Sequence, residues 1–172
     1  HVSPDLDTMM YTLAGLSNPE TGWGLAGETF NTLDMMTRYK ALTWFNLGDK
    51  DLATHIERTR LLREGWSLSE VTQRLCRCLG VEVSVLPMSD QPVRTIAETA
   101  EGDLSFQEYF VMRQCEPPIK GVRFQGAEKA RMSPAFELAL QKASAVIFCP
   151  SNPVVSIGPI LSVPGVVDAL RS

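Results

Sequence analysis

The sequence predicts an α/β fold with an antiparallel insertion around residues 91–125. Three observations support this prediction. Apolar residues recur with helical spacing before residue 80, the spacing changes to two at residues 81–86, and short apolar runs bounded by proline or glycine follow. Because 172 residues suffice for one ordinary domain and not for two, residues 1–172 are expected to form a single domain.

Four helices are expected in the first half of the chain. The first follows Ser3, and Asp5 or Asp7 can cap it. Ser67 and Glu70 form a capping box, which is the clearest helix start in the chain. The other expected ranges are residues 29–39 for the second helix and 52–63 for the third, and Gly80 ends the fourth.

Strands are expected mainly in the second half. Residues 81–86 alternate in the manner of a strand until Pro87 stops them, and residues 101–103 supply the turn of a hairpin. The remaining expected elements are strands at residues 93–97, 104–112, 122–124 and 145–149, the last of them buried, and a helix at residues 134–142.

The composition excludes several classes of protein. Hydrophobic residues make up 44% of the chain and charged residues 21%, which is unlike a disordered tail, a collagen-like fibre or a disulfide miniprotein. The net charge of -4 gives no reason to expect a nucleic-acid partner, and no apolar run approaches the length that spans a membrane. The four cysteines are scattered without metal-binding spacing, so structural thiols and a cytoplasmic location are expected.

Asp5 and Asp7 stand two residues apart at the start of the first expected helix. They could supply hard oxygen ligands to Mg²⁺, which is bound in proteins by one or two carboxylates together with phosphate oxygens. They could instead be helix caps that interact with the helix dipole. From the residues alone, the cap is the favoured interpretation.

Residues 46–51 precede the third helix and form the second candidate site. Gly48 permits close approach of the backbone, the amino end of the helix attracts an anion, and Lys50 adds a positive charge. The alternative is an acidic turn in which Asp49 or Asp51 is a cap. His55 follows one turn later, as a general base or, in the favoured interpretation, as a partly buried histidine.

Ser151 and Asn152 lie directly after the last expected strand, in a polar loop that continues to Gly158. Short hydroxyl, amide and backbone N–H groups in such a loop suit a phosphate or a nucleotide, and the alternative is a stiff turn. The three candidate sites together indicate a phosphorylated ligand with Mg²⁺.

Four motifs, in one order along the chain, resemble the 2-phospho-L-lactate transferase family of coenzyme F-420 biosynthesis. They are residues 3–8, 44–55, 106–109 and 150–160, and the loop at residues 88–90 and residues 163–165 fit as well. The resemblance implies a Rossmann-like, mostly parallel sheet with an inserted smaller region. It also implies that the chain is a fragment, because the family has an upstream strand with a glycine-rich phosphate loop and a further segment downstream.

The resemblance further implies a Mg²⁺-dependent transferase. Such an enzyme moves a phospholactyl group, or a phosphoenolpyruvyl group in actinobacterial relatives, from a guanosine-diphosphate-linked donor to the deazariboflavin precursor Fo, and GMP is released. The partners expected from it are therefore small molecules, with a homodimer as an open expectation. A non-catalytic module that binds a nucleotide or the deazaflavin is the alternative function.

The family's motifs also assign roles to residues. Asp7 and Asn46 match positions associated with Fo, and we expect Asp7 to be the catalytic base. Asp5 and Asp7 are the expected metal ligands. The other expected substrate-binding residues are Gly48 and Asp49 at the start of the third helix, and Ser151 and Asn152 near the donor nucleotide.

Overall fold

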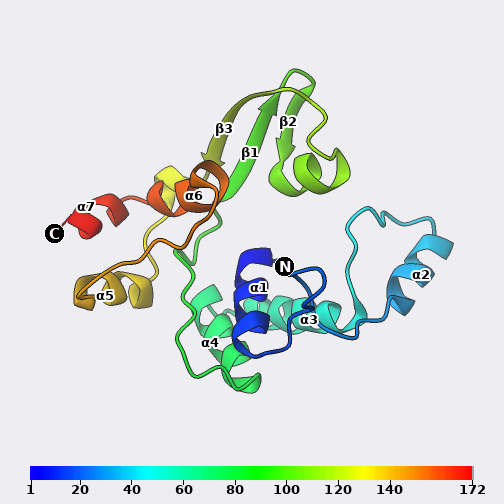
Figure 1. Cartoon of the computed structure of the whole chain (residues 1–172), viewed down its shortest axis with the longest axis horizontal. Coiled ribbons are helices and arrows are strands. Elements are labelled where there is room, and N and C mark those ends of the chain that lie inside the picture. Colours follow the sequence, from blue (N-terminus) through cyan, green and yellow to red (C-terminus); the bar gives the residue numbers. More distant parts are fainter. Residues whose placement is uncertain (172) are drawn as a thin grey trace. The chain divides into compact units, whose positions relative to one another are not determined.

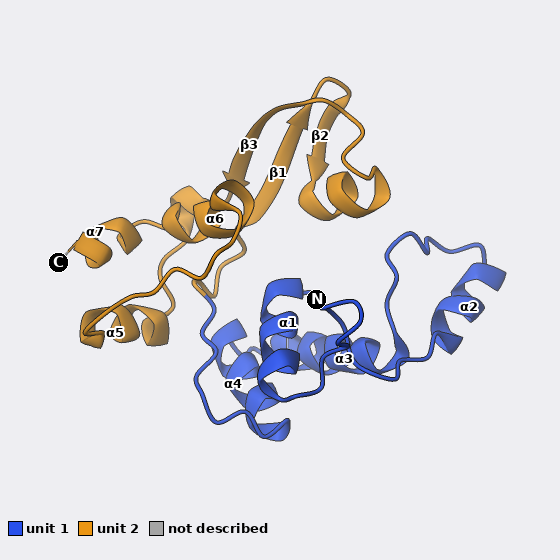
Figure 2. Ribbon diagram, in the orientation of Figure 1, with its two compact units in different colours: residues 1–87 blue, residues 88–172 orange. Residues whose placement is uncertain are grey.

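The computed structural model describes residues 1–171, and its chain divides into two compact units (Figure 2). Unit 1 runs from His1 to Pro87, and unit 2 begins at Met88. None of the helices within residues 1–171 has the length and apolar character needed to cross a membrane.

Unit 1 is built from helices (Figure 1). Its small core is formed where α1, α4 and the two loops around them meet, with Met10, Tyr11, Leu25, Cys76 and Val81 buried together. The helices are α1 (Pro4–Leu13), α2 (Asn31–Arg38), α3 (Asp49–Arg63) and α4 (Leu68–Cys78), which confirms the four that the sequence predicts.

The capping box at the start of α4 is confirmed in detail. The Glu70 backbone N–H donates to the Ser67 hydroxyl, and the Ser67 backbone N–H donates to the Glu70 carboxylate at 2.7 Å. Each group satisfies a donor that the helix itself leaves unpaired. The box therefore fixes where α4 begins.

The strand predicted at residues 81–86 is wrong. Gly80 takes a positive φ of 74° after α4, and the Val81 N–H closes the helix end by donating to the Cys76 carbonyl. Val81 is buried against the core, but Val83 is 56% exposed, and no strand of residues 1–171 pairs with this segment. Residues 81–86 have the alternating sequence of a strand, but no strand of residues 1–171 lies beside them to complete the pairing.

Unit 2 contains an antiparallel sheet in the strand order β2-β1-β3, which lies within the predicted insertion. Thr99 pairs with Gly102, so the turn of the hairpin between β1 and β2 is formed by residues 100–101. The predicted hairpin is confirmed, and its turn begins one residue before the predicted range of 101–103. The strands are β1 (Arg94–Thr99), β2 (Gly102–Ser105) and β3 (Ile119–Gln125).

The strand predicted at residues 104–112 ends early, at Ser105. The Ser105 N–H donates to the Glu108 carboxylate at 2.9 Å and the Glu108 N–H donates to the Ser105 hydroxyl at 3.3 Å. This reciprocal pairing is a helix start, and a π-helix at Glu108–Met112 follows it. A local capping pair thus overrides the apolar run that suggested a strand.

The remaining elements of unit 2 are short helices. α5 (Pro134–Lys142) matches its predicted range. The buried strand predicted at residues 145–149 is wrong, because Ile147 is 86% exposed and the segment pairs with no strand of the described residues 1–171. Further helical elements are Ala127–Lys129, Pro153–Ile157, α6 (Gly158–Leu161) and α7 (Val166–Arg171).

The mixed α/β class is therefore confirmed, but the sheet is not the one expected. Every strand pairing within residues 1–171 is antiparallel. The Rossmann-like parallel sheet is not formed by these residues. The segments at residues 81–86 and 145–149, both predicted as strands, belong to no strand of residues 1–171.

Candidate functional site

Asp7 lies in the first turn of α1 and is buried. Ser3 precedes the helix as its N-cap and Pro4 opens it, and the Asp7 N–H donates to the Ser3 carbonyl at 3.0 Å. The Asp7 side chain is only 6% exposed, whereas Asp5 is exposed to solvent. The two carboxylates of the predicted pair therefore have different environments.

Arg58 on α3 is the partner of Asp7. Its Nη1 donates to Asp7 Oδ2 at 3.2 Å, and its Nη2 donates to Asp7 Oδ1. This is the two-pronged pairing that a guanidinium makes with a carboxylate, and it fixes both the position and the rotation of the carboxylate. The Arg58 side chain is 1% exposed, so the ion pair is buried.

His55 lies one turn before Arg58 on the same helix and is also buried. Arg58 Nη1 is 3.2 Å from His55 Nδ1. A guanidinium has only donors, so Nδ1 must be the acceptor, and the neutral imidazole carries its proton on Nε2. That Nε2 lies 3.5 Å from Asp51 Oδ1. The tautomer follows from the contacts, and it directs the proton of His55 toward Asp51.

Asp51 links this cluster to Tyr11. The Tyr11 hydroxyl donates to Asp51 Oδ1 at 2.7 Å. Burial raises the pKa of Tyr11 well above its ordinary value, so the phenol remains a donor. Burial acts to raise the pKa of Asp51 as well, but its contacts with His55 and Tyr11 outweigh burial and lower the pKa. Asp51 is therefore held as an ionised acceptor.

The same burial acts on Asp7. Desolvation raises the pKa of Asp7, and the Arg58 guanidinium opposes that rise through its hydrogen bonds and its charge. Asp7, Arg58, His55, Asp51 and Tyr11 thus form one continuous polar network between α1 and α3, which we call the Asp7 cluster.

The Asp7 cluster contains a donor set for a cation. Asp7, Asp51 and His55 each carry a potential ligand atom, and these atoms lie within 4.8 Å of one another. In the tautomer described above, Nδ1 of His55 accepts from Arg58 and Nε2 carries the proton, so the two carboxylates are the ligands open to a cation. Two carboxylates fit the oxygen preference of Mg²⁺, and each carboxylate keeps free lone pairs beside its present contacts. Asp5 is not part of this group. The sequence paired Asp5 with Asp7, whereas the structure places Asp51 and His55 beside Asp7.

A cavity of about 330 Å³ lies next to the cluster in unit 1. Tyr11, Lys50 and Thr54 are its polar lining residues, and leucines form much of the rest. A largely apolar cavity with a few polar groups is typical of a small-molecule site. Because Tyr11 also contacts Asp51, this cavity borders the Asp7 cluster.

The loop before α3 contains the other predicted residues of unit 1. Asn46 is exposed, Gly48 is buried as the N-cap of α3, and Asp49 is its first residue. The backbone N–H groups of Lys50 and Asp51, which the sequence offers to a ligand anion, donate instead to the Glu28 carboxylate. Glu28 was not singled out from the sequence, although Gly48 has no side chain and some other residue had to cap α3.

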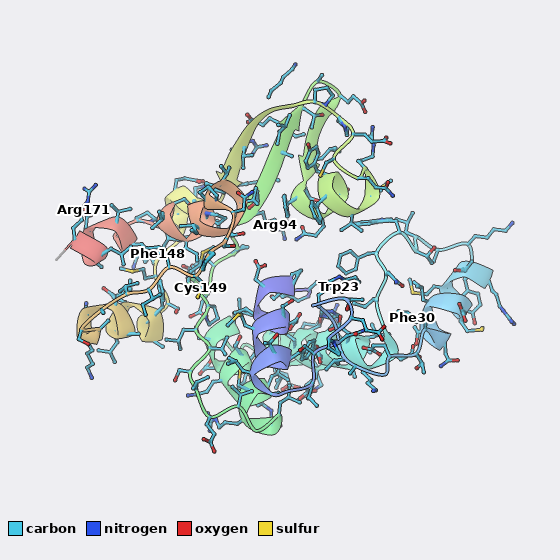
Figure 3. The ribbon with its side chains drawn as sticks, viewed as in Figure 1. Trp23, Phe30, Arg94, Phe148, Cys149 and Arg171 are labelled. Atoms are coloured by element: carbon cyan, nitrogen blue, oxygen red, sulfur yellow. The ribbon has the colours of Figure 1, made fainter. Side chains whose placement is uncertain are left out.

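Ser151 and Asn152 belong to unit 2 and are both exposed. They follow an extended segment that carries Phe148 and Cys149 (Figure 3). Asn152 Oδ1 accepts from the Val154 N–H at 2.9 Å and from the Val155 N–H at 3.1 Å. The side-chain carbonyl of Asn152 therefore caps a helical turn.

Comparisons with known proteins give one consistent result. A family model described as 2-phospho-L-lactate transferase CofD matches residues 1–172. A 2-phospho-L-lactate transferase from Methanospirillum hungatei is 45% identical over 170 residues, which cover 99% of this chain and 57% of the relative. A phosphoenolpyruvate transferase from Mycolicibacterium smegmatis is 42% identical over 178 residues, which cover 99% of this chain and 54% of the relative. The chain thus spans a little over half the length of these curated relatives.

Solved structures are more distant in sequence. Protein BH3568 from Bacillus halodurans matches with a TM-score of 0.64 at 17% identity, covering 95% of this chain and 49% of that one. A second structure of BH3568, described as a member of the UPF0052 family, matches with a TM-score of 0.52 at 18% identity, over 95% of this chain and 48% of that one. At such identities the likeness shows the fold alone.

Proposed function

The chain belongs to the 2-phospho-L-lactate transferase CofD family, and we propose on this basis that the full-length protein transfers a substituted phosphate group to a deazaflavin in coenzyme F-420 biosynthesis. The proposed acceptor is the terminal hydroxyl of Fo. The proposed donor is GMP joined through a diphosphate linkage to a lactyl or an enolpyruvyl group, so that the transferred group is phospholactyl or phosphoenolpyruvyl. The acceptor oxygen forms a bond to the transferred phosphorus, the bond to the GMP oxygen breaks, and GMP leaves. The observation that carries the proposal is the family match over the whole chain.

Asp7 is proposed to serve the acceptor hydroxyl. The hydroxyl must lose a proton as its oxygen attacks, and a positioned carboxylate can take that proton. The fork of Arg58 holds the Asp7 carboxylate in one orientation and leaves a lone pair on each oxygen. Such fixed orientation is what transfer of a phosphoryl-type group requires, because positioning and charge neutralisation supply most of the acceleration.

Mg²⁺ is proposed as the cofactor, with Asp7 and Asp51 as the carboxylates that would hold it. When bound, the ion would neutralise charge on the donor diphosphate. Asp5 is exposed in the same turn of α1, and we propose that it reaches the ion through bound water.

The donor nucleotide is proposed to contact Ser151 and Asn152. Both are exposed polar residues at the start of a helical turn. The relatives carry two names, one for each donor. We propose that the donor is one of these two. We also propose a cytoplasmic location and a homodimer for the full-length protein.

The test is a GMP-release assay on the full-length protein with Mg²⁺, Fo and each donor in turn, with the mass of the deazaflavin product measured alongside. We expect GMP release that depends on Fo and equals the phosphorylated product formed. Absence of Fo-dependent GMP release with both donors would contradict the transferase. Fo binding without turnover would favour the alternative, a deazaflavin-binding module.

A further inference from the structure

The segment between Glu28 and Asp49 is held by polar contacts at its base. No residue of α2 is buried, so apolar packing within unit 1 does not fix this helix. Figure 1 shows α2 at the far end of a long loop that leaves the rest of unit 1 and returns to the start of α3. Asn46 lies on the returning arm of this loop, three residues before Asp49.

Glu28, just before the loop, caps α3. Its Oε2 accepts from the Lys50 N–H and its Oε1 accepts from the Asp51 N–H, both at 2.9 Å. These are the second and third N–H groups of α3, which an N-cap side chain ordinarily satisfies. Gly48, the actual N-cap, has no side chain that could do so.

Asp49, at the start of α3, caps α2 in return. Its Oδ2 accepts from the Asn31 N–H and its Oδ1 from the Thr32 N–H, both at 3.0 Å. The Thr29 hydroxyl adds a donor to Oδ2 at 2.6 Å. Each of the two helices therefore has its amino end capped by a carboxylate from the other end of the loop, and we call Glu28 and Asp49 together the reciprocal latch.

The reciprocal latch requires glycine at position 48 for a steric reason. Its φ of -75° is available to any residue, so the backbone alone does not require glycine there. A Cβ on residue 48 would lie 2.5 Å from Glu28 Oε2 and would collide with the carboxyl group. A side chain at this position therefore has to expel Glu28 from the end of α3.

We propose that the reciprocal latch of Glu28 and Asp49 positions the Asn46 loop for the acceptor, and that Glu28 is a positioning residue for binding of Fo. The inference rests on the proposed function, in which Asn46 contacts Fo. In this proposal the amino end of α3 binds the Glu28 carboxylate and does not bind the donor phosphate. Gly48 then acts by leaving room for Glu28.

The experiment compares Glu28→Ala, Gly48→Ala and the double variant in the full-length protein. We expect each single variant to raise the KM for Fo at least about 5-fold, the loss typical of one hydrogen-bonded contact, with the KM for the donor unchanged. If Gly48 acts through Glu28, the double variant is no worse than either single variant. Multiplying effects in the double variant, or a raised donor KM in Gly48→Ala, would contradict the assignment of Gly48.

A matched control separates positioning from general loss of a helix cap. Ser67→Ala removes the N-cap of α4 in the same unit and leaves residues 28–49 untouched. We expect a similar loss of thermal stability from Ser67→Ala and from Glu28→Ala, but a raised KM for Fo only from Glu28→Ala. An equal rise of KM in both variants would overturn the role of Glu28 as a positioning residue.

Amide hydrogen exchange tests the latch apart from the proposed function. Glu28→Ala should speed exchange at Lys50 and Asp51, and also at Asn31 and Thr32, because release of one cap loosens the other. Unchanged exchange at Asn31 and Thr32 would overturn the reciprocal latch. If the wild-type protein fails to bind Fo while exchange responds as expected, the proposed function fails and the latch stands.

Discussion

The buried ion pair between Arg58 and Asp7 makes a sharp prediction about stability. In Arg58→Met the side chain keeps much of its length but loses its charge and its donors. The Asp7 side chain is 6% exposed and would be left as a buried carboxylate without a cation. Removing one partner of a buried pair typically costs about 3–5 kcal/mol, so we expect a loss of this size in the free energy of unfolding.

Two further variants show where that loss comes from. Arg60→Met is the matched control, because Arg60 is on the same helix, 49% exposed and paired with Glu57 and Glu64. Exposed pairs contribute about 0–1 kcal/mol, so little should change. Asp7→Leu combined with Arg58→Met removes both charges, and we expect it to recover most of the lost stability.

Urea unfolding of the full-length protein, followed by tryptophan fluorescence, measures these changes. The three tryptophans of this chain, Trp23, Trp44 and Trp66, all lie in unit 1, where the ion pair is. If Arg58→Met costs no more than Arg60→Met, the account of a buried pair that holds Asp7 in place is refuted.

Three further predictions concern the metal, pH and the donor. A chelator should abolish GMP release, and equal turnover with and without the chelator would remove the metal from the mechanism. Asp5→Asn should lower the rate of GMP release more than it lowers the affinity for Fo, which calorimetry measures. Hydrogen bonds, first from the Thr29 hydroxyl, hold the pKa of Asp49 below its ordinary value of 3.8, and Ser67 lowers the pKa of Glu70 below 4.5. Because both pKa values are depressed in the folded state, the stability they contribute is present above these ordinary values and is lost as the pH falls through the folded pKa values. Urea midpoints should therefore fall as the pH drops below about 5, and they should fall less in Asp49→Asn. An equal acid loss in that variant would count against the cap. Ser151→Ala with Asn152→Ala should raise the KM for the donor and not the KM for Fo, and an unchanged donor KM would sink that assignment.

Local signals in the sequence predicted the elements that depend on local contacts. Ser67 and Glu70 lie three residues apart, so the start of α4 could be found from the residues themselves. Ser105 and Glu108 have the same spacing, and their pairing turns a predicted strand into a helix. The spacing is the same at both places, but residues 104–112 also form an apolar run of the kind that predicts a strand, and the cap there was not predicted from the sequence.

Contacts between distant residues explain what the sequence could not predict. Arg58 is 51 residues from Asp7 along the chain. Glu28 is 23 residues from Asp51, whose backbone N–H donates to it. Neither pairing leaves a local pattern, so Arg58 and Glu28 could not be assigned from spacing. The strands predicted at residues 81–86 and 145–149 failed for a related reason, because a strand needs a partner that periodicity alone does not supply.

The loop of unit 1 that carries Asn46 is proposed to receive Fo, and this proposal depends on the affinity of the Asn46→Ala variant for Fo. Asn46 is exposed, so its truncation should leave the stability of the full-length protein unchanged. Loss of its hydrogen bond to the ligand should weaken Fo binding by about 5- to 150-fold, which corresponds to about 1–3 kcal/mol. Fluorescence titration with Fo gives this number, and an unchanged affinity in a stably folded Asn46→Ala variant would contradict the account.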